Sequence, residues 1–483
     1  MANPSQISLY NTQSQKKESF EPIRPGEVSM YGCGPTVYGL IHVGNARAFL
    51  VQDLLVRTLE ASGYRVNFAR NYTDVDDKII NKAAEEGVDA MEIAQRFSEE
   101  FDADMRALDV RPPNHKPKAT EHIGEIIAMI EKLVQGGHAY PAETPFGSDV
   151  YFRVSSFAEY GKLSKRPIDE LLNQSRIAPG EQKESAVDFA LWKAAKPGEP
   201  SWASPWGEGR PGWHIECSAM IDAIFPERLD IHLGGSDLVF PHHENEIAQS
   251  EACDNHRPLA RYWVHNGMLQ IQRVKMSKSL GNFMTLRDFL DGFGPEVLRL
   301  LVSQTHYRSL LDFGGDSIIR SEILLEKLYR NTLEWRGSHH EAATEAEASA
   351  EFFEALRDDL NAAKALGLVF KRLKALQKNG DNAEAAALWN GFYMPTLRKI
   401  IGVLKEDPVS AIDNIRARRL KRSGLSENEF QNIESLLTKR WELKEAKAYA
   451  EADEVRKQVE GMGIQVMDSP DGWTWTPARQ SLE

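Results

Sequence analysis

The stretch from Val28 to Ala69 most constrains the fold, because it reads as a strand, a helix and a second strand in direct succession. Val28 to Cys33 is typical of a short strand, and a turn begins at Gly34. Gly63 stands where a helix often ends, and Tyr64 to Ala69 alternates as a strand does. Between them, apolar residues recur at helical spacing on one face, at Val51, Leu54, Leu55 and Leu59.

A strand–helix–strand unit of this kind builds a parallel, doubly wound sheet, so the sequence predicts an α/β fold with a Rossmann-like parallel sheet. The predicted helix starts just after the turn His42-Val43-Gly44. Its first backbone N–H groups therefore face whatever binds at this turn.

Changes in residue pattern divide the 483-residue chain further. Short strand-like pieces, loops and a lysine-rich tract interrupt the α/β pattern, and we interpret them as an insertion that splits a nucleotide-binding domain. The predicted parts are the first half of this domain at 1–125, the insertion at 126–205, the second half at 206–283, a stem-contact region at 284–315, a helical bundle at 316–406, and a linker with a small C-terminal α/β domain at 407–483.

From Pro295 onward the pattern predicts four helices, at Val297 to Ser303, Ile318 to Trp335, Phe352 to Gln377 and Ala383 to Leu404. Asp407 to Gly424 carries five basic residues, and we expect a linker whose charges face solvent or RNA. Beyond it the pattern predicts helices near Glu427 to Leu437 and Ala446 to Met462. A hairpin is expected from Ile464 to Trp475, with its turn at Asp471.

Composition excludes several classes of protein. The net charge of −13 argues against indiscriminate nucleic-acid binding, although a local basic face can still bind phosphates on an acidic protein. Three cysteines in so long a chain do not make a disulfide framework, which favours a reducing, cytoplasmic setting. No apolar run has the length of a membrane span, and Met1 to Glu21 lacks the apolar core of a signal peptide.

Two short motifs carry candidate phosphate ligands. His42 and the helix N-terminus behind it can both donate to phosphate oxygens, and Gly44 allows a nucleotide to approach the backbone closely. Lys275 and Lys278 lie in residues 275–279, Lys-Met-Ser-Lys-Ser, where a mobile loop can bring positive charge to a departing pyrophosphate. Taken singly, each motif is typical of a buried histidine or a solvated loop. Their joint occurrence favours a site that binds ATP, and ATP brings Mg²⁺ with it.

Two cysteines, a histidine and a glutamate form a candidate metal site. Cys33 ends the first predicted strand, and Cys217 lies in a later strand–turn–helix segment. His242 and Glu246 are four residues apart and therefore share one face of a helix. Two thiolates, an imidazole and a carboxylate form a donor set that suits zinc.

Spacing alone leaves two choices open at this candidate site. His243 can take the place of His242, and Glu244 can take the place of Glu246. Buried, inert thiols beside a His/Glu pair on a helix surface are the alternative interpretation. Cys253 has no comparable neighbours, and we interpret it as structural.

Residues 34–45, Gly-Pro-Thr-Val-Tyr-Gly-Leu-Ile-His-Val-Gly-Asn, and residues 275–279 resemble the two signature motifs of class I aminoacyl-tRNA synthetases. The resemblance narrows to the cysteinyl-tRNA synthetase family and extends along most of the chain. The matching stretches are Leu9 to Thr12, Met30 to Asn45, Asn71 to Lys78, Ala119 to Ile123, Asp188 to Lys193, Ser204 to Met220, Asp230 to Asp237, Pro241 to Glu246, Lys275 to Asn282, Tyr307 to Ser309 and Asp358 to Ala363.

This resemblance implies roles for individual residues. The zinc ligands of the family correspond to Cys33, Cys217, His242 and Glu246. Its substrate pocket corresponds to Thr73, Trp213 and His232. Its ATP-loop lysine corresponds to Lys278. One departure from the class I motif is Asn45, where many synthetases carry a second histidine, and this leaves open which group contacts the phosphates there.

The resemblance also implies an enzyme that activates L-cysteine with ATP, releases pyrophosphate, and transfers cysteine to the 3′ end of tRNA-Cys. One zinc ion per chain is expected to select the substrate thiolate over the near-isosteric alcohol of serine, because sulfur is the softer ligand and ionises more readily. Four protein ligands leave no open position, so we expect Glu246 to bind weakly or zinc to become five-coordinate. A cytoplasmic monomer is the expected form.

Two other functions remain open. A small-molecule cysteine ligase resembling the mycothiol-pathway enzyme shares this catalytic domain, but the residues after Asp407 are superfluous for a small acceptor and suit anticodon recognition. Trp473 and Trp475 are candidate stacking platforms there, with a core role as the alternative. A catalytically silent RNA-binding or zinc-scaffold protein has no need of His42 and Lys278 together.

Overall fold

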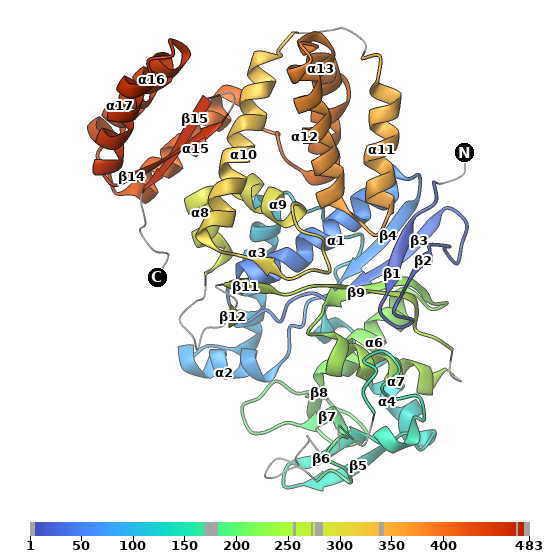
Figure 1. Cartoon of the computed structure of the whole chain (residues 1–483). Coiled ribbons are helices and arrows are strands. Elements are labelled where there is room, and N and C mark those ends of the chain that lie inside the picture. Colours follow the sequence, from blue (N-terminus) through green and yellow to red (C-terminus); the bar gives the residue numbers. More distant parts are fainter. Residues whose placement is uncertain are drawn as a thin grey trace. The chain divides into compact units, whose positions relative to one another are not determined.

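The computed structural model describes residues 5–167, 170, 182–254, 257–271, 274–275, 284–337, 342–469 and 472–477 (Figure 1). The chain divides into two compact units. The first comprises Met1–Met268, Tyr307–Ser309 and Glu354–Asn361, and the second comprises Leu269–His306, Leu310–Phe353 and Ala362–Glu483. Among the helices of the described ranges, none combines the length and the apolarity needed to cross a bilayer.

A four-stranded parallel sheet forms the centre of the first unit. Its strand order is β10-β9-β3-β4, with bounds Ala260–Asn266, Leu229–Gly235, Glu27–Gly32 and Arg65–Arg70. All three pairings are parallel, and Met30 of β3 stands opposite Ile231 of β9. The predicted α/β fold with a parallel sheet is confirmed. Two stretches of chain about 200 residues apart thus form adjacent strands.

Helix α1 (Val43–Ala61) makes the crossover from β3 to β4 that the sequence predicts. His42 caps its N-terminus, and Ser62 and Gly63 end it, Gly63 with a φ of 96° that a residue without Cβ adopts freely. Its apolar face is buried, with Leu55 and Leu59 fully inaccessible. Figure 1 shows α1 on one side of the sheet and α6 and α7 on the other, which is the doubly wound arrangement.

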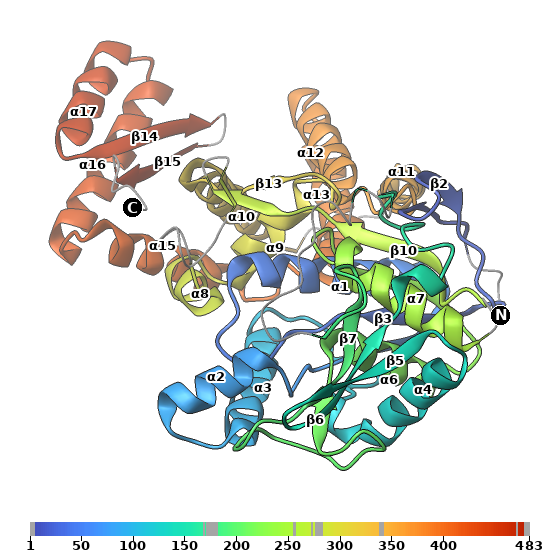
Figure 2. The same cartoon turned by 90° about the horizontal axis from the view of Figure 1, so that it is seen from below.

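The insertion forms an antiparallel sheet of its own, in the order β5-β6-β7-β8 (Figure 2). Its strands are Ala139–Thr144, Gly147–Phe152, Phe189–Ala194 and Gly209–Pro211. Because β8 pairs with β7, this sheet continues past the predicted boundary at residue 205. The other elements of the first unit are β1 (Ser8–Asn11), β2 (Lys16–Ser19), α2 (Asp77–Glu86), α3 (Ala90–Ala107), α4 (Ile123–Gln135), α6 (Trp213–Ile224) and α7 (Glu244–Cys253).

The second unit is mainly helical, apart from two small sheets. Its helices are α8 (Leu286–Phe293), α9 (Pro295–Ser303), α10 (Gly315–Glu334), α11 (Glu345–Arg357, whose end belongs to the first unit), α12 (Ala362–Lys378), α13 (Asn382–Leu388), α14 (Met394–Thr396), α15 (Pro408–Ser423), α16 (Glu427–Glu445) and α17 (Tyr449–Gly461). Its strands are β11 (Leu269–Ile271), β12 (Val274–Lys275), β13 (Leu311–Asp312), β14 (Ile464–Ser469) and β15 (Gly472–Pro477).

The single helix predicted from Phe352 to Gln377 is wrong, because the chain breaks between α11 and α12. Asp359 and Leu360 there have φ values of 60° and 53°, in the left-handed region that ends a right-handed helix. The buried carboxylate of Asp359 accepts hydrogen bonds from the backbone of Tyr10 at 2.9 Å and from the Tyr307 hydroxyl at 2.7 Å. These contacts hold the break in place.

The linker predicted from Asp407 to Gly424 is also wrong, since this segment is helix α15. Asp407 caps its N-terminus, Pro408 occupies the first turn, and Gly424 ends it in the left-handed region. Four of its five basic residues have acidic partners within the second unit. Arg419 is 2% exposed and bonds to Glu326 of α10 at 2.9 Å.

Three further basic residues of α15 make similar pairs, Arg422 with Glu322 at 2.7 Å, Lys421 with Asp291 at 2.6 Å and Arg416 with Glu434 at 3.7 Å. The run therefore joins α15 to its neighbouring helices. It does not present a row of unpaired cations to RNA or solvent.

The C-terminal hairpin is confirmed, because β14 and β15 pair antiparallel from Ile464 to Pro477, while its predicted turn residue Asp471 lies outside the described residues. Trp475 is fully buried, and its indole N–H donates to Glu434 at 2.6 Å. Trp473 is partly buried against the same apolar cluster. Burial removes Trp475 from the candidates for base stacking and assigns it to the core.

Substitution of Arg419 tests the role of this helix. Arg419→Met leaves Glu322 and Glu326 in a buried setting with one cation fewer, which we expect to destabilise the second unit by about 3–5 kcal/mol. Arg416→Met is the matched control and is expected to cost about 1 kcal/mol or less, because its ion pair is partly exposed. Urea unfolding followed by tryptophan fluorescence measures both, and equal losses of stability would contradict a special role for the buried Arg419 ion pairs.

Candidate functional site

The structure brings the four predicted metal ligands together. The candidate ligand atoms of Cys33, Cys217, His242 and Glu246 all lie within 4.8 Å of one another, and all four residues are buried. Cys33 directly follows β3, Cys217 lies in α6 and Glu246 lies in α7. The site therefore depends on the end of a central strand and on the two helices that cover that face of the sheet.

The geometry settles the choice between the two glutamates. Glu246 points into the cluster, where Oε1 lies 3.0 Å from Nε2 of His242. Glu244 points elsewhere, and its carboxylate accepts backbone N–H groups of Gly161 at 3.0 Å and Ser164 at 2.7 Å. Glu244 thus anchors the insertion to α7.

The two neighbouring histidines both approach the cluster. A second group of possible ligands combines His243 with Cys33, His232 and Glu246. Nε2 of His243 lies 3.3 Å from Sγ of Cys33, but only one thiol belongs to this second group. The group with His242 contains both thiols, which makes it the better match to a zinc shell.

The two thiols of the cluster differ in ionisation. Burial, followed by the hydrogen bond to Cys217, raises the pKa of the Cys33 thiol well above its usual value. The hydrogen bond from Cys33, together with contact to His242, lowers the pKa of Cys217 to about 6. The Cys217 sulfur is therefore the more readily ionised of the two.

The other two members of the cluster are held in their charged forms. Burial opposes ionisation of Glu246, but His232 and His242 outweigh it and hold the pKa of this carboxyl well below its usual range. Burial likewise opposes protonation of His242, yet Glu246 and Cys217 raise its pKa to about 10. The negative charge of this cluster favours a proton on His242, and the same charge is well suited to a divalent cation.

Two of the three predicted pocket residues lie against this cluster. The ring of Trp213 stacks on His242 with centroids 4.4 Å apart, and Trp213 is 40% exposed. Nε2 of His232 lies 2.8 Å from Oε2 of Glu246, and the imidazole stacks on Trp263. One face of the candidate metal site is thus covered by an accessible indole, and another by a buried imidazole.

The third pocket residue, Thr73, follows β4. Its backbone N–H donates to the Pro35 carbonyl at 3.2 Å, close in sequence to Cys33. The side chain of Asn71 accepts the N–H of Gly34 at 2.8 Å and donates to the Thr73 hydroxyl at 3.4 Å. Asn71 therefore connects the strand end that carries Cys33 with the segment that carries Thr73.

The turn at His42 is a closed capping arrangement. Nδ1 of His42 accepts the backbone N–H of Asn45 at 3.2 Å, and Oδ1 of Asn45 accepts the backbone N–H of His42 at 3.3 Å. A Cβ at Gly44 would lie 2.8 Å from the His42 ring. Gly44 thus makes room for the imidazole, and Asn45 fixes the turn through its side chain.

Sequence analysis missed Arg47, one turn further along α1. It is 1% exposed and donates to the carbonyls of Met268 at 2.7 Å, Tyr307 at 3.1 Å and Ser309 at 2.5 Å. Met268 immediately precedes β11 in the chain, so Arg47 ties the helix of the His42 turn to the start of the segment that leads to Lys275. Sequence spacing gives no signal for contacts more than 200 residues apart.

The predicted lysine loop is only partly within the described residues. Lys275 ends β12, where its backbone pairs with Gln270, and its side chain is outside the described part. Lys278 lies outside the described residues altogether. The predicted role of these lysines stays a prediction.

Cys253 belongs to neither group of possible ligands among the described residues. Its thiol lies 3.6 Å from the Met129 carbonyl, and burial raises its pKa to about 12. This agrees with the structural role expected from the sequence.

Comparison with known proteins identifies the family. Residues 19–322 match the model of the tRNA synthetases class I (C) catalytic domain, and residues 351–405 match the DALR domain. Curated relatives described as Cysteine--tRNA ligase include one from Nitratidesulfovibrio vulgaris strain Hildenborough, 47% identical over 97% of this chain and 99% of its own length. Another, from Halorhodospira halophila, is 45% identical over 98% of this chain and 100% of its own length.

Solved structures share the fold at low identity. A methionyl-tRNA synthetase of Mycobacterium tuberculosis with methionyl-adenylate matches with a TM-score of 0.57 at 15% identity, over 83% of this chain and 95% of that chain. A ternary complex of LeuRS, tRNA and LeuAMS from Agrobacterium radiobacter matches with a TM-score of 0.58 at 10% identity, over 81% and 86%. The family model and the curated relatives show that the chain belongs to the cysteine–tRNA ligase family of class I tRNA synthetases.

Proposed function

We propose that this chain joins L-cysteine to tRNA in two steps. The cysteine carboxylate attacks the α-phosphate of ATP, which forms cysteinyl-adenylate and releases pyrophosphate. Cysteine then passes to the 3′ end of tRNA-Cys and AMP leaves. The observation that carries this proposal is identity of 47% to a Cysteine--tRNA ligase over 97% of the chain, together with a buried Cys₂HisGlu cluster.

We further propose that Cys33, Cys217, His242 and Glu246 hold one zinc ion. When bound, zinc supplies a soft Lewis acid that binds the substrate thiol as thiolate and discriminates against the serine alcohol. The accessible indole of Trp213 and the imidazole of His232 flank this position and would define how the substrate side chain enters. Size alone would discriminate weakly between the two amino acids.

The position of Glu246 supports the expectation that it is the weak ligand. Oε1 of Glu246 lies near His242, while Oε2 lies 2.8 Å from Nε2 of His232. The carboxylate therefore keeps a hydrogen-bonded partner if it withdraws from the metal.

The nucleotide is proposed to bind where α1 begins. His42 and the first N–H groups of α1 would donate to phosphate oxygens, and Mg²⁺ would accompany ATP. Lys275 and Lys278 would stabilise the charge of the departing pyrophosphate from their loop. The capped turn holds His42 in position before substrate arrives, which reduces the reorganisation needed for the chemical step.

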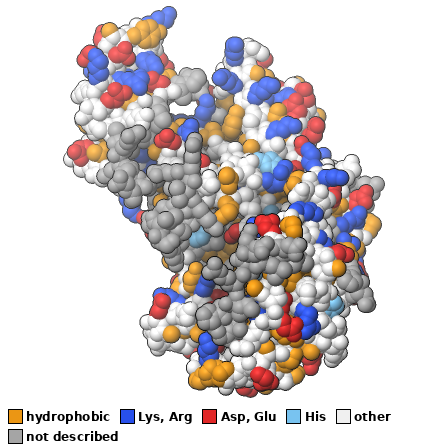
Figure 3. All heavy atoms as spheres, turned by 60° about the horizontal axis from the view of Figure 1, so that its bottom comes forward, with side chains coloured by type: hydrophobic (Ala, Val, Ile, Leu, Met, Phe, Trp, Pro, Cys, Tyr) orange, Lys and Arg blue, Asp and Glu red, His pale blue; other side chains and the backbone are white. Residues whose placement is uncertain are grey.

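The small-molecule ligase is the weaker alternative. The relatives described as Cysteine--tRNA ligase align over 97% of this chain, which includes the part after Asp407. On the face drawn in Figure 3, acidic and basic side chains are intermixed among the coloured atoms. RNA binding would accordingly depend on local sets of basic side chains and not on one broad basic face. We also propose that the chain acts as a monomer.

Cys217→Ser tests the metal site, with Cys253→Ser as the matched control. We expect Cys217→Ser to lower zinc content from about one per chain and to lower cysteine-dependent pyrophosphate exchange about 100-fold, because a hard hydroxyl replaces a thiolate ligand. Cys253→Ser should leave both near the wild-type level, since Cys253 is outside the cluster. Metal analysis and exchange assays measure the effects, and full zinc in Cys217→Ser would remove this residue from the site.

Truncation tests the C-terminal part. Ending the chain at Gly424 removes α16, α17 and the hairpin but keeps Arg419 on Glu322 and Glu326. We expect this variant to retain cysteine-dependent exchange and to lose most tRNA charging. Ending the chain at Glu406 also removes α15 and should lower thermal stability as well. If the variant that ends at Gly424 charged tRNA as well as the full chain, the last 59 residues would not contribute to tRNA recognition.

A further inference from the structure

The insertion loop, residues 160–166, is bound to the first turn of α7 through one buried carboxylate. Glu244 is 0% exposed and accepts the backbone N–H groups of Gly161 at 3.0 Å, Leu163 at 3.3 Å and Ser164 at 2.7 Å. Backbone N–H groups that converge in this way form a nest for an anion. Three donors on one carboxylate fix the loop and the helix to each other.

Two further contacts join the insertion loop to α7. The Tyr160 hydroxyl donates to Oδ1 of Asn245 at 2.6 Å, in a buried position. Lys162 forms an ion pair with Glu251, whose carboxylate also accepts the backbone N–H of Leu259 at 3.3 Å. The loop therefore holds α7 at its first turn and again near its last.

Two candidate metal ligands lie inside the segment that the insertion loop contacts. His242 and Glu246 stand on either side of Glu244 in the chain. Before them, the guanidinium of Arg166 lies 5.0 Å from the ring centroid of Phe240. The loop thus contacts the chain before, between and after these two ligands, so a shift of the loop would displace both of them.

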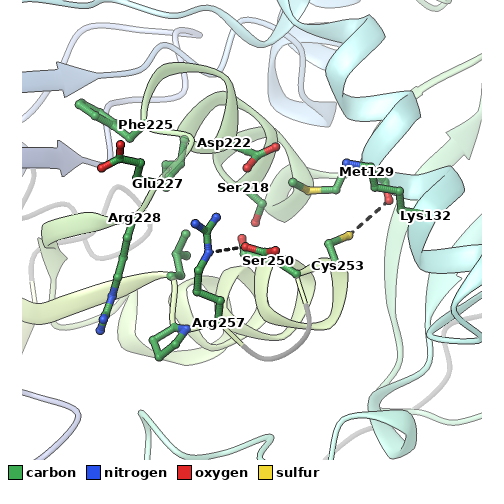
Figure 4. A pocket seen from close by; sticks show the side chains of 14 residues that line it. Met129, Lys132, Ser218, Asp222, Phe225, Glu227, Arg228, Ser250, Cys253 and Arg257 are labelled. Carbon is green, nitrogen blue, oxygen red and sulfur yellow. Dashed lines mark hydrogen bonds and ion pairs between the residues drawn. The ribbon is translucent and has the colours of Figure 1, made fainter.

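The interface between α6 and α7 supports α7 only in part. Gln249 joins the two helices, because its side-chain N–H donates to the Ser218 hydroxyl at 2.8 Å. Beside this contact lies a pocket of about 120 Å³, lined by Ser218 and Asp222 of α6 and by Ser250 and Cys253 of α7 (Figure 4). Packing on this side of α7 is therefore incomplete, and the contacts of the insertion loop do more to fix its first turn.

We propose that Glu244 is a positioning residue for the metal site. By holding the insertion loop, it fixes the segment that carries His242 and Glu246. Metal–ligand distances stay within about 0.2 Å of their preferred values, so a displaced first turn of α7 would weaken both ligands together. Residues that only orient metal ligands can contribute 10–100-fold to metal affinity. This inference rests on the proposed zinc site.

Zinc affinity of the full chain, measured by competition with a chromophoric chelator, tests the proposal. Glu244→Gln keeps the size of the side chain, but its NH₂ group faces a backbone donor whichever oxygen it replaces. We expect zinc to bind about 10-fold more weakly in this variant.

Asp188→Asn is the matched control. The buried carboxylate of Asp188 accepts the backbone N–H groups of Val154 at 2.9 Å and Ser185 at 3.1 Å, entirely within the insertion. Both substitutions should lower the Tm, because each leaves a buried donor without its acceptor. Only Glu244→Gln should also weaken zinc binding and change the absorption spectrum of Co²⁺ bound in place of zinc. A merely structural role of Glu244 would change the Tm alone.

A pair of tyrosines keeps the test decisive if Glu244→Gln does not fold. Tyr160→Phe removes one hydrogen bond to α7, whereas Tyr140→Phe removes one of 2.8 Å to Asp188 within the insertion. We expect zinc affinity to fall about 3-fold in Tyr160→Phe, as the loss of one neutral hydrogen bond allows, and to stay near the wild-type level in Tyr140→Phe.

The possible failures are distinguishable. Zinc binding by the wild-type chain with equal affinities in Glu244→Gln and Asp188→Asn, or in the two tyrosine variants, would overturn this inference and leave the proposed zinc site intact. A wild-type chain that binds no zinc would overturn the proposed site, and this inference with it.

Discussion

The parallel pairing of β3 with β9 is the constraint on which the site depends. It places Gly32 opposite Leu233, and the N–H of Cys33 donates to the Leu233 carbonyl at 3.2 Å. A shift of one residue in this register would turn the alternate face of β3 toward α6 and α7. Cys33 would then no longer meet Cys217 and Glu246. The two halves of the catalytic domain thus have to assemble before the candidate metal site exists.

The sequence predicted the parts of the molecule whose signals are local. These signals lie within a few residues of one another: the spacing of apolar residues, the end of a strand and a glycine after a helix. The predicted strand–helix–strand segment β3-α1-β4 is confirmed for this reason. The choice between His242 and His243 could not be predicted in this way. Adjacent residues have the same local signals, and only the fold shows that His242 belongs to the group that contains both thiols.

Other features could not be predicted. Some buried side chains have partners that are distant in sequence, and the charge of one segment suggested a linker where the structure has a helix. Arg47 reaches carbonyls more than 200 residues away. For α15, the density of positive charge favoured a linker. The capping residues Asp407 and Gly424 were the better signal, because local helix signals outweigh charge when acidic partners are present in the fold.

The fit between Gly44 and the His42 ring has a consequence for how this turn tolerates change. Because a methyl group at position 44 would meet the imidazole at 2.8 Å, the smallest possible side chain there displaces the ring before it reaches any nucleotide. The displaced ring can no longer accept the Asn45 N–H, so the first turn of α1 loosens at the same time. A side chain at position 44 would therefore disturb the cap of α1 at the same turn where we propose that phosphate binds.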